Sequence, residues 1–279
     1  SGSVQVVMDL SAVPHLASLK TSVPFINFFD GFRTSHEYHK IECLDQEDIR
    51  PLVDEEDIKR FRDRAMTPER PVVRGTAENP ETFFTHREAS NSAYENVAEV
   101  VEHYLGEISK ITGREYHLFD YYGAKDAENI IILMGSATEA AREAIDYLMS
   151  QGKKVGMIAV HLYRPFSVKH FVDVLPESVK KIAVLDRTKE PGSVGEPLYE
   201  DVFSSLYEAG RTGIKVVGGR YGLGSKDTPP SSAFAIFEGL KKDAPQREFT
   251  IGIVDDVTNL SLPEDPEAPN TAAEGTIEC

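Results

Sequence analysis

The sequence contains very little cysteine. Cys43 and Cys279 are the two cysteines among 279 residues, and they form no CxxC pair. A disulfide framework needs several paired cysteines, and an iron-sulfur cluster is usually held by about four thiolates. Two distant cysteines therefore argue against both kinds of site within this chain and favour a reducing compartment.

Long apolar runs are also missing. No run approaches the roughly 18 apolar residues that can cross a bilayer. The first residues also lack the charged and then apolar order of a secretory signal peptide. We therefore expect no membrane partner and no secretion. The chain starts at Ser1 without an initiator methionine, from which we expect a processed or excised chain.

Basic residues are outnumbered by acidic ones. Thirty Lys and Arg residues against 46 Asp and Glu residues give a net charge of −16. Such a balance repels a phosphate backbone, so we expect no nucleic-acid partner. The acids concentrate in residues 42–57 and 263–279. Charge runs are usually solvated, and we interpret residues 263–279 as an acidic interdomain linker.

Short apolar runs alternate with amphipathic stretches in the second half of the chain. The apolar runs predict strands at residues 130–134, 155–160, 182–186, 214–217 and 249–254. The first four runs are each followed by apolar residues at helical spacing. Strands so rich in Ile and Val are typical of parallel sheets buried on both faces. Residues 123–262 are therefore predicted to form an α/β domain with a doubly wound, mostly parallel sheet.

The first 122 residues have a different pattern. Apolar residues at helical spacing follow Val6, residues 24–29 are typical of a buried strand, and a long helix is predicted over residues 92–112. A single strand cannot satisfy its own backbone donors and acceptors when it is buried. We therefore expect residues 1–122 to be part of a second α/β domain whose other strands lie outside the chain.

The loop after the predicted strand at residues 24–29 carries polar side chains. Open α/β sheets bind ligands at the carboxyl ends of their strands. Arg33, Thr34 and His36 are therefore candidates for a ligand crevice or an interdomain contact. Thr34 and Glu37 also match a capping box, in which case they would only start a helix.

A metal site at this loop is a weaker hypothesis. His36 and His39 would share one face of a helix, with Glu37 and Cys43 nearby. The spacing differs from HExxH, and no thiolate pair is present. We therefore expect no metal site.

Two later loops also follow predicted strands. Arg187 and Lys189 could contact a ligand or an adjoining domain, or they could form salt bridges within their own loop. Arg220 and Lys226 lie in a glycine-rich stretch that could cradle an anion. Its spacing differs from a P-loop, so a tight turn with exposed Arg and Lys is the favoured interpretation. No GxSxG or comparable nucleophile motif occurs, and no catalytic residue is predicted.

Seven stretches carry a resemblance to known proteins. They are VPFINFFDGFRTSHE, ENPETFFTHREASN, HLFDYYGAKDAENIIILMGSA, VHLYRPFSVKH, AVLDRTKEPGSVGEPLY, GGRYGLGSKD and IGIVDDVTNLSLP. In this order they resemble consecutive landmarks of the pyruvate:ferredoxin (flavodoxin) oxidoreductase family, and the resemblance runs to Leu262.

The resemblance implies a parent enzyme that converts pyruvate and coenzyme A to acetyl-CoA and CO2. It implies thiamine diphosphate, Mg and iron-sulfur clusters in the parent, and ferredoxin or flavodoxin as the electron acceptor. Residues 1–122 are similar to the latter part of the first domain, which helps to form the thiamine site. Residues 123–262 are similar to the second domain, which resembles the transketolase C-terminal domain.

This chain departs from the complete family pattern. It lacks the start of the first domain, a GDG-type motif for the thiamine pyrophosphate, and the cluster cysteines. We therefore expect a structural segment that binds no cofactor by itself and is inactive alone. Its partners would be the remaining domains of the parent, which the resemblance implies to be a homodimer in the cytoplasm or in an anaerobic energy organelle.

Three alternatives remain open from the sequence. The first is a non-catalytic interaction module that docks partners through the loops at Arg187 and Arg220. The second is a segment of a relative that reduces NADP. The third is a metal-dependent enzyme that uses His36, Glu37 and His39.

Overall fold

The structure is a computed structural model of the 279-residue chain. It describes all residues except 33, 37, 74, 267 and 272–279. The chain forms two compact units, and each is described by itself. Unit 1 consists of Ser1–Val4, Phe29–His39 and residues 119 onward, whereas unit 2 consists of Gln5–Phe28 and Lys40–Leu118.

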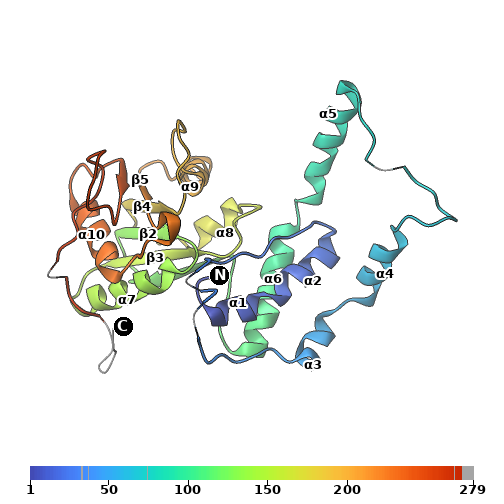
Figure 1. Cartoon of the computed structure of the whole chain (residues 1–279), viewed down its shortest axis with the longest axis horizontal. Coiled ribbons are helices and arrows are strands. Elements are labelled where there is room, and N and C mark those ends of the chain that lie inside the picture. The colour runs from blue at the N-terminus through green and yellow to red at the C-terminus, as the bar shows by residue number, and fades with distance from the viewer. Residues whose placement is uncertain (33, 37, 74, 267, 272–279) are drawn as a thin grey trace. The chain divides into compact units, whose positions relative to one another are not determined.

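A six-stranded sheet forms the centre of unit 1 (Figure 1). Its strands are β1 Phe119–Gly123, β2 Asn129–Leu133, β3 Val155–Val160, β4 Lys181–Asp186, β5 Lys215–Arg220 and β6 Glu248–Thr250. The strand order is β1-β3-β2-β4-β5-β6. Strand β1 is antiparallel to β3, and every other neighbouring pair is parallel. The predicted mostly parallel sheet is therefore confirmed.

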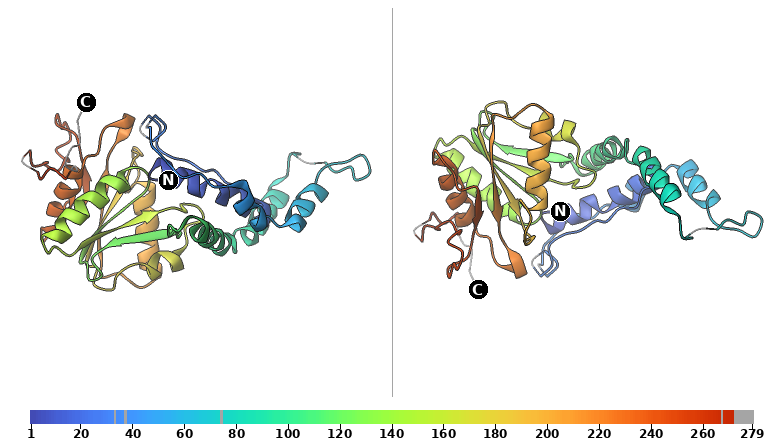
Figure 2. Two further views of the ribbon diagram at one scale, coloured as in Figure 1. Left: turned by 90° about the horizontal axis from the view of Figure 1, so that it is seen from below. Right: turned by 90° about the horizontal axis from the view of Figure 1, so that it is seen from above.

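Helices cover both faces of this sheet (Figure 2). They are α7 Ala137–Ser150, α8 Val168–Asp173, α9 Pro197–Glu208 and α10 Pro230–Lys241, with a 3-10 turn at Leu223–Ser225. Helices α7 and α10 share one core with alternate strand residues such as Ile131, Leu133 and Leu185. Helix α9 packs on β4 and contacts α8. The doubly wound arrangement that the apolar runs predicted is confirmed.

The neighbouring strands β2 and β4 mark the place where the winding changes direction. The chain leaves β2 into α7, which packs against β3, and leaves β4 into α9, which packs against β5. In open α/β sheets a crevice forms at the carboxyl ends of two such strands. Here that crevice lies between residues 134–136 after β2 and residue 187 after β4.

Two details of the sheet differ from the prediction. Strand β1 was not predicted, because its five residues include Asp120 and form no continuous apolar run. Strand β6 is shorter than the predicted strand at residues 249–254. Gly252 takes a positive φ of 81°, which ends the extended geometry, and Val254 is exposed.

Unit 2 is built from helices. These are α1 Val4–Leu10, α2 Ala12–Thr21, α3 Gln46–Ile49, α4 Glu55–Asp63, α5 Pro80–Ala89 and α6 Val97–Thr112, with 3-10 turns at Arg50–Leu52 and Ser90–Ala93. Helix α2 packs on α6 around buried Leu16, Val101 and Ile108. Helix α6 ends at Gly113, whose φ of 70° forms a left-handed cap, at the end predicted for the long helix.

Polar contacts complete the packing of unit 2. Buried Asp9 accepts hydrogen bonds from Arg114 Nε at 2.7 Å and from the Tyr116 hydroxyl at 2.5 Å. Arg60 of α4 donates to the Lys20 carbonyl at the end of α2, at 2.9 Å. These contacts tie α1 to the segment after α6, and α4 to α2.

The predicted strand at residues 24–29 is wrong. This stretch forms neither strand nor helix, and the Ile26 side chain is 87% exposed. A strand needs a neighbour for its backbone hydrogen bonds. The described part of unit 2 contains no strand with which residues 24–29 could pair. The location of partner strands outside the chain stays a prediction.

Candidate functional site

The crevice between β2 and β4 holds a carboxylate from the chain itself. Asp30 Oδ2 accepts a hydrogen bond from the Ser136 backbone N–H at 2.5 Å, where helix α7 begins. The approach is close, since a Cβ on Gly135 would lie 2.6 Å from Asp30 Oδ2. A negative charge is stabilised at this place by the orphan N–H groups and the dipole of the helix.

Arg187 forms the opposite side of the crevice. Its Nη1 lies 2.5 Å from Asp30 Oδ1, and its Nε donates to the Gly222 carbonyl at 2.8 Å. Burial raises the pKa of Asp30, but the hydrogen bond from Ser136 and the Arg187 guanidinium outweigh burial and hold that pKa below its ordinary value. Asp30 therefore stays ionised and binds the segment 29–39 to the sheet.

A second buried carboxylate anchors α9. Asp186, at the end of β4, accepts hydrogen bonds from the backbone N–H groups of Leu198 at 2.9 Å and Tyr199 at 3.1 Å. Burial raises the pKa of Asp186 to about 6, although these two hydrogen bonds act in the opposite direction. The side chain therefore positions the first turn of the helix.

Glu196 binds one cation from the loop after β4 and one from the end of β5. Its Oε1 lies 3.4 Å from Arg220 Nη1 and 3.6 Å from Lys189 Nζ. Its Oε2 accepts the Glu190 backbone N–H at 2.7 Å. The structure therefore brings Lys189 and Arg220 to one carboxylate, which gives them a structural role.

The prediction of an exposed Arg220 in a glycine-rich turn is wrong. Arg220 is the last residue of β5 and is 9% exposed. The preceding glycines belong to the strand because side chains pack over them. A Cβ on Gly219 would lie 2.3 Å from the Phe249 ring. Only the later glycines, Gly222 and Gly224, take the positive φ of a turn.

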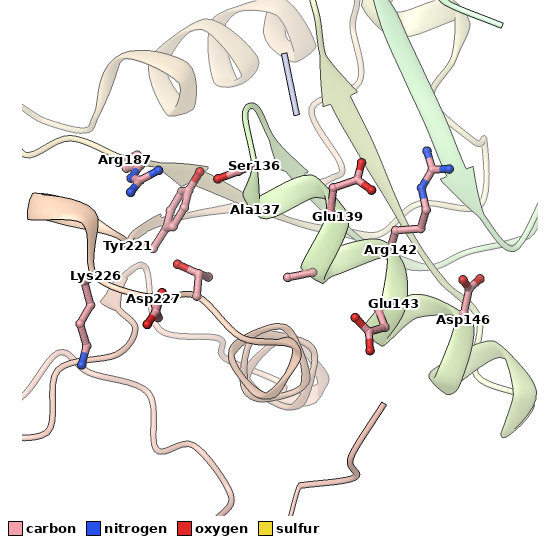
Figure 3. Close-up of a pocket in the computed structure, with 12 residues that line it drawn as sticks. Ser136, Ala137, Glu139, Arg142, Glu143, Asp146, Arg187, Tyr221, Lys226 and Asp227 are labelled. Carbon is pink, nitrogen blue, oxygen red and sulfur yellow. The ribbon is translucent and has the colours of Figure 1, made fainter. Parts of the chain in front are cut away.

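A cavity of about 550 Å³ lies beside this crevice (Figure 3). Arg187, Tyr221 and Lys226 line it, together with one face of α7. That face contributes Glu139, Arg142, Glu143 and Asp146. Of the candidate residues that the structure describes, Arg187 and Lys226 reach the cavity. The mixed charge of its lining does not match the anion cradle that was considered from the sequence.

The described residues of the loop at 31–36 form turns. The predicted capping box at Thr34 and the helical face shared by His36 and His39 are therefore wrong, whereas a ligand or interdomain contact at Thr34 and His36 stays a prediction. Phe32 takes a positive φ of 60°, which few residues other than glycine adopt. Thr34 is buried, and exposed His36 stacks on Phe32 and contacts the Ser35 hydroxyl at 2.8 Å.

Two residues of that motif cannot be placed. Arg33 and Glu37 lie outside the described residues. Among the residues that the structure describes, no group of three or more His, Cys, Asp or Glu side chains could hold a metal ion. Within the same residues, no helix is both long and apolar enough to cross a membrane.

The comparisons with known proteins point to one enzyme family along the whole chain. Residues 1–105 match the family profile "Pyruvate flavodoxin/ferredoxin oxidoreductase, thiamine diP-bdg", and residues 127–232 match "Pyruvate:ferredoxin oxidoreductase core domain II". The pyruvate-flavodoxin oxidoreductase of Enterobacter agglomerans is 56% identical over 277 residues, which make up 99% of this chain. The chain belongs to the pyruvate:ferredoxin (flavodoxin) oxidoreductase family.

Other members of this oxidoreductase family extend the likeness. The pyruvate:ferredoxin oxidoreductase of Moorella thermoacetica is 55% identical over 279 residues, or 100% of the chain. The mitochondrial pyruvate dehydrogenase [NADP(+)] of Euglena gracilis is 46% identical over 280 aligned positions and is covered to 16% of its length. The chain spans 24% of the length of the Enterobacter and Moorella proteins.

Asp30 and Glu196 are the main residues that sequence reasoning missed in this oxidoreductase segment. Asp30 pairs with a residue 157 positions away. Such pairs leave no periodic trace in the sequence. The only available signal was an acid that directly follows an apolar run.

Proposed function

We propose that this chain is a segment of a pyruvate:ferredoxin (flavodoxin) oxidoreductase. The parent enzyme would oxidatively decarboxylate pyruvate, transfer the acetyl group to coenzyme A, release CO2 and pass two electrons to ferredoxin or flavodoxin. The observation that carries this proposal is 55% and 56% identity over almost the whole chain, combined with coverage of 24% of each relative.

The role of the segment in that enzyme would be structural. The charged groups of its crevice already satisfy one another, because Asp30 binds Arg187 and Ser136, and Glu196 binds Arg220. In this proposal residues 1–122 contribute to the thiamine-site domain, residues 123–262 form the transketolase C-terminal-like domain, and residues 263–279 form the interdomain linker.

The cofactors would be held by other parts of the parent. Thiamine diphosphate binds through Mg at its pyrophosphate, and this sequence lacks a GDG-type motif for that group. Iron-sulfur clusters need thiolates, and this sequence supplies only two cysteines. The residues present therefore do not fit these groups, and no reaction step is assigned to them. The partners would be the remaining domains and the electron carrier, within a homodimer in the cytoplasm or an anaerobic organelle.

The structure argues against one alternative function. An interaction module that docks through Arg187 and Arg220 needs these side chains at its surface. Both guanidinium groups instead bind carboxylates inside unit 1. The alternative with NADP as acceptor keeps support from the 46% identity to the Euglena enzyme.

A comparison of two polypeptides tests the proposed function. The first is this chain, and the second is the product of the complete reading frame that contains it. Each is supplied with pyruvate, coenzyme A, thiamine diphosphate, Mg²⁺ and a viologen dye. We expect dye reduction and acetyl-CoA only with the complete polypeptide. Turnover by the 279-residue chain, or a complete polypeptide without pyruvate-dependent turnover, would overturn the proposal.

A further inference from the structure

The connecting segment between α4 and α6, residues 65–96, is not covered within unit 2. None of its described residues is buried. Its large apolar side chains are exposed, and they are Met66, Val72, Val73, Phe83, Phe84 and Tyr94. Several exposed large apolar side chains within one segment are typical of a surface that binds another protein surface.

The sequence of this segment nevertheless specifies a helix. Asn79 Oδ1 accepts the Thr82 backbone N–H at 3.0 Å and caps α5, and Pro80 occupies the first turn. Glu81 lies in the first turn and Arg87 in the last, which suits the helix dipole. The cap, the proline and the charges all agree with the helix that forms.

Helix α5 is too short to be stable without packing. It has 10 residues, whereas isolated helices shorter than about 12–15 residues are marginal in water. Its Phe83 and Phe84 side chains are 55% and 70% exposed. The side-chain contacts near it are local, such as His86 Nδ1 at 2.8 Å from Glu78 Oε1. The helix therefore has the local signals of a folded element, but it lacks a tertiary partner among the residues of its unit that the structure describes.

Unit 2 offers a direct comparison. Helix α4 has 9 residues and is also short. It is held by Arg60 on the Lys20 carbonyl and by Lys20 on buried Asp57 at 3.4 Å. Helix α5 has no contact of this kind among the described residues of unit 2.

The connecting segment is a regular part of the family. It lies inside residues 1–105, which match the thiamine diphosphate-binding profile. It also lies inside the match to the Moorella protein, which covers 100% of this chain. An insertion peculiar to this chain would interrupt these matches. The same relatives extend far beyond the match, since the chain spans 24% of their length. A large amount of polypeptide is therefore available to cover the segment.

We propose that residues 65–96 are a docking element, covered in the parent enzyme by an apolar surface of the same polypeptide outside residues 1–279. Phe83 and Phe84 are its anchors. Large aromatic side chains dominate the energetics of such contacts. This inference rests on the proposed function, because it requires the longer polypeptide.

Hydrogen exchange tests the docking element. Amide exchange of the peptide that covers residues 80–93 is measured in this chain and in the complete polypeptide. We expect exchange at least about tenfold slower in the complete polypeptide, because docking removes local opening. The double variant Phe83→Glu/Phe84→Glu in the complete polypeptide should return exchange to the rate of the isolated chain. The control Val257→Glu changes an exposed residue of unit 1 and should leave that peptide protected.

Three outcomes would overturn the docking element. The first is equal exchange of residues 80–93 in both polypeptides. The second is protection already present in the dilute isolated chain, which would assign the cover to unit 1. The third is protection that rises with the concentration of the isolated chain, which would assign it to a second copy. Pyruvate-dependent dye reduction by the same complete polypeptide separates a failure of docking from a failure of the proposed function.

Discussion

Within unit 1, the contacts of Asp30 with Ser136 and Arg187 should contribute most to holding the segment around Asp30 against the sheet. The variant Asp30→Ala removes the acceptor of the Ser136 N–H and the partner of Arg187, both at 2.5 Å. The Asp30 and Arg187 side chains are only 15% and 22% exposed. Loss of one partner of a fully buried pair costs about 3–5 kcal/mol. With this partial exposure, we expect a loss of about 2–3 kcal/mol for unit 1.

The assay must report on unit 1 alone, because two units can unfold separately. Hydrogen exchange of peptides from β2 and β4, followed at rising urea concentration, gives the free energy of unfolding of that unit. The matched control is Asp126→Ala, whose partner Lys154 lies at the same 2.5 Å but whose side chain is 60% exposed. The control should have almost no effect, since exposed pairs contribute little. Equal losses for the two variants would refute the reasoning.

The pH dependence of the same contact has a definite sign. The pKa of Asp30 is lowered in the fold, so its contribution is present above the unfolded pKa of about 3.9 and is lost as the pH falls through the folded value. The difference between the wild type and Asp30→Asn should therefore be constant near pH 7 and shrink below about pH 4. Added formate should partly restore Asp30→Ala and leave Asp126→Ala unchanged. A difference that grows on acidification would contradict this assignment.

Three further variants probe the rest of the structure. Asp186 has a pKa raised to about 6. The free energy of unfolding of unit 1 should therefore fall by up to about 3 kcal/mol as the pH rises from 4 to 6. Urea titrations of Asp186→Asn should show no such pH dependence. Asp9→Ala removes the buried acceptor of Arg114, which is 33% exposed and keeps Glu42 as a second partner, and should destabilise unit 2 by about 2–3 kcal/mol, seen as faster exchange of α6 amides; unchanged exchange would contradict it. Gly219→Ala places a Cβ 2.3 Å from Phe249 and should cost about 1–3 kcal/mol. Gly213→Ala, with no atom within 4 Å of its Cβ, is the control, and equal thermal midpoints of the two glycine variants would count against the packing argument.

The sequence was most informative where burial imposed a pattern. The predicted strand at residues 155–160 coincides with β3, because every residue of that strand is buried and apolar except its glycine. The predicted helix end before Gly113 agrees with α6, because glycine takes the left-handed conformation of a helix cap without strain. Strand β1 escaped prediction because it lies at the edge of the sheet, where partly exposed positions break the apolar run.

The candidate site was harder to predict than the fold. The candidate residue Arg187 lines the cavity beside the crevice, and its role there stays a prediction. Its partner Asp30 could not be inferred from spacing. At residues 24–29 the sequence predicted an element that does not form. Their apolar composition predicts a strand, and composition cannot tell whether a neighbouring strand is present to pair with it.

The central claim is that this chain is one part of a longer pyruvate oxidoreductase. The most direct test purifies the native enzyme by its pyruvate- and coenzyme A-dependent viologen reduction, and then measures the denatured mass of the polypeptide that contains this sequence. The account predicts a mass about four times the 31.0 kDa of the chain, since the chain spans 24% of its relatives. An active enzyme whose polypeptide with this sequence has a mass near 31.0 kDa would contradict it.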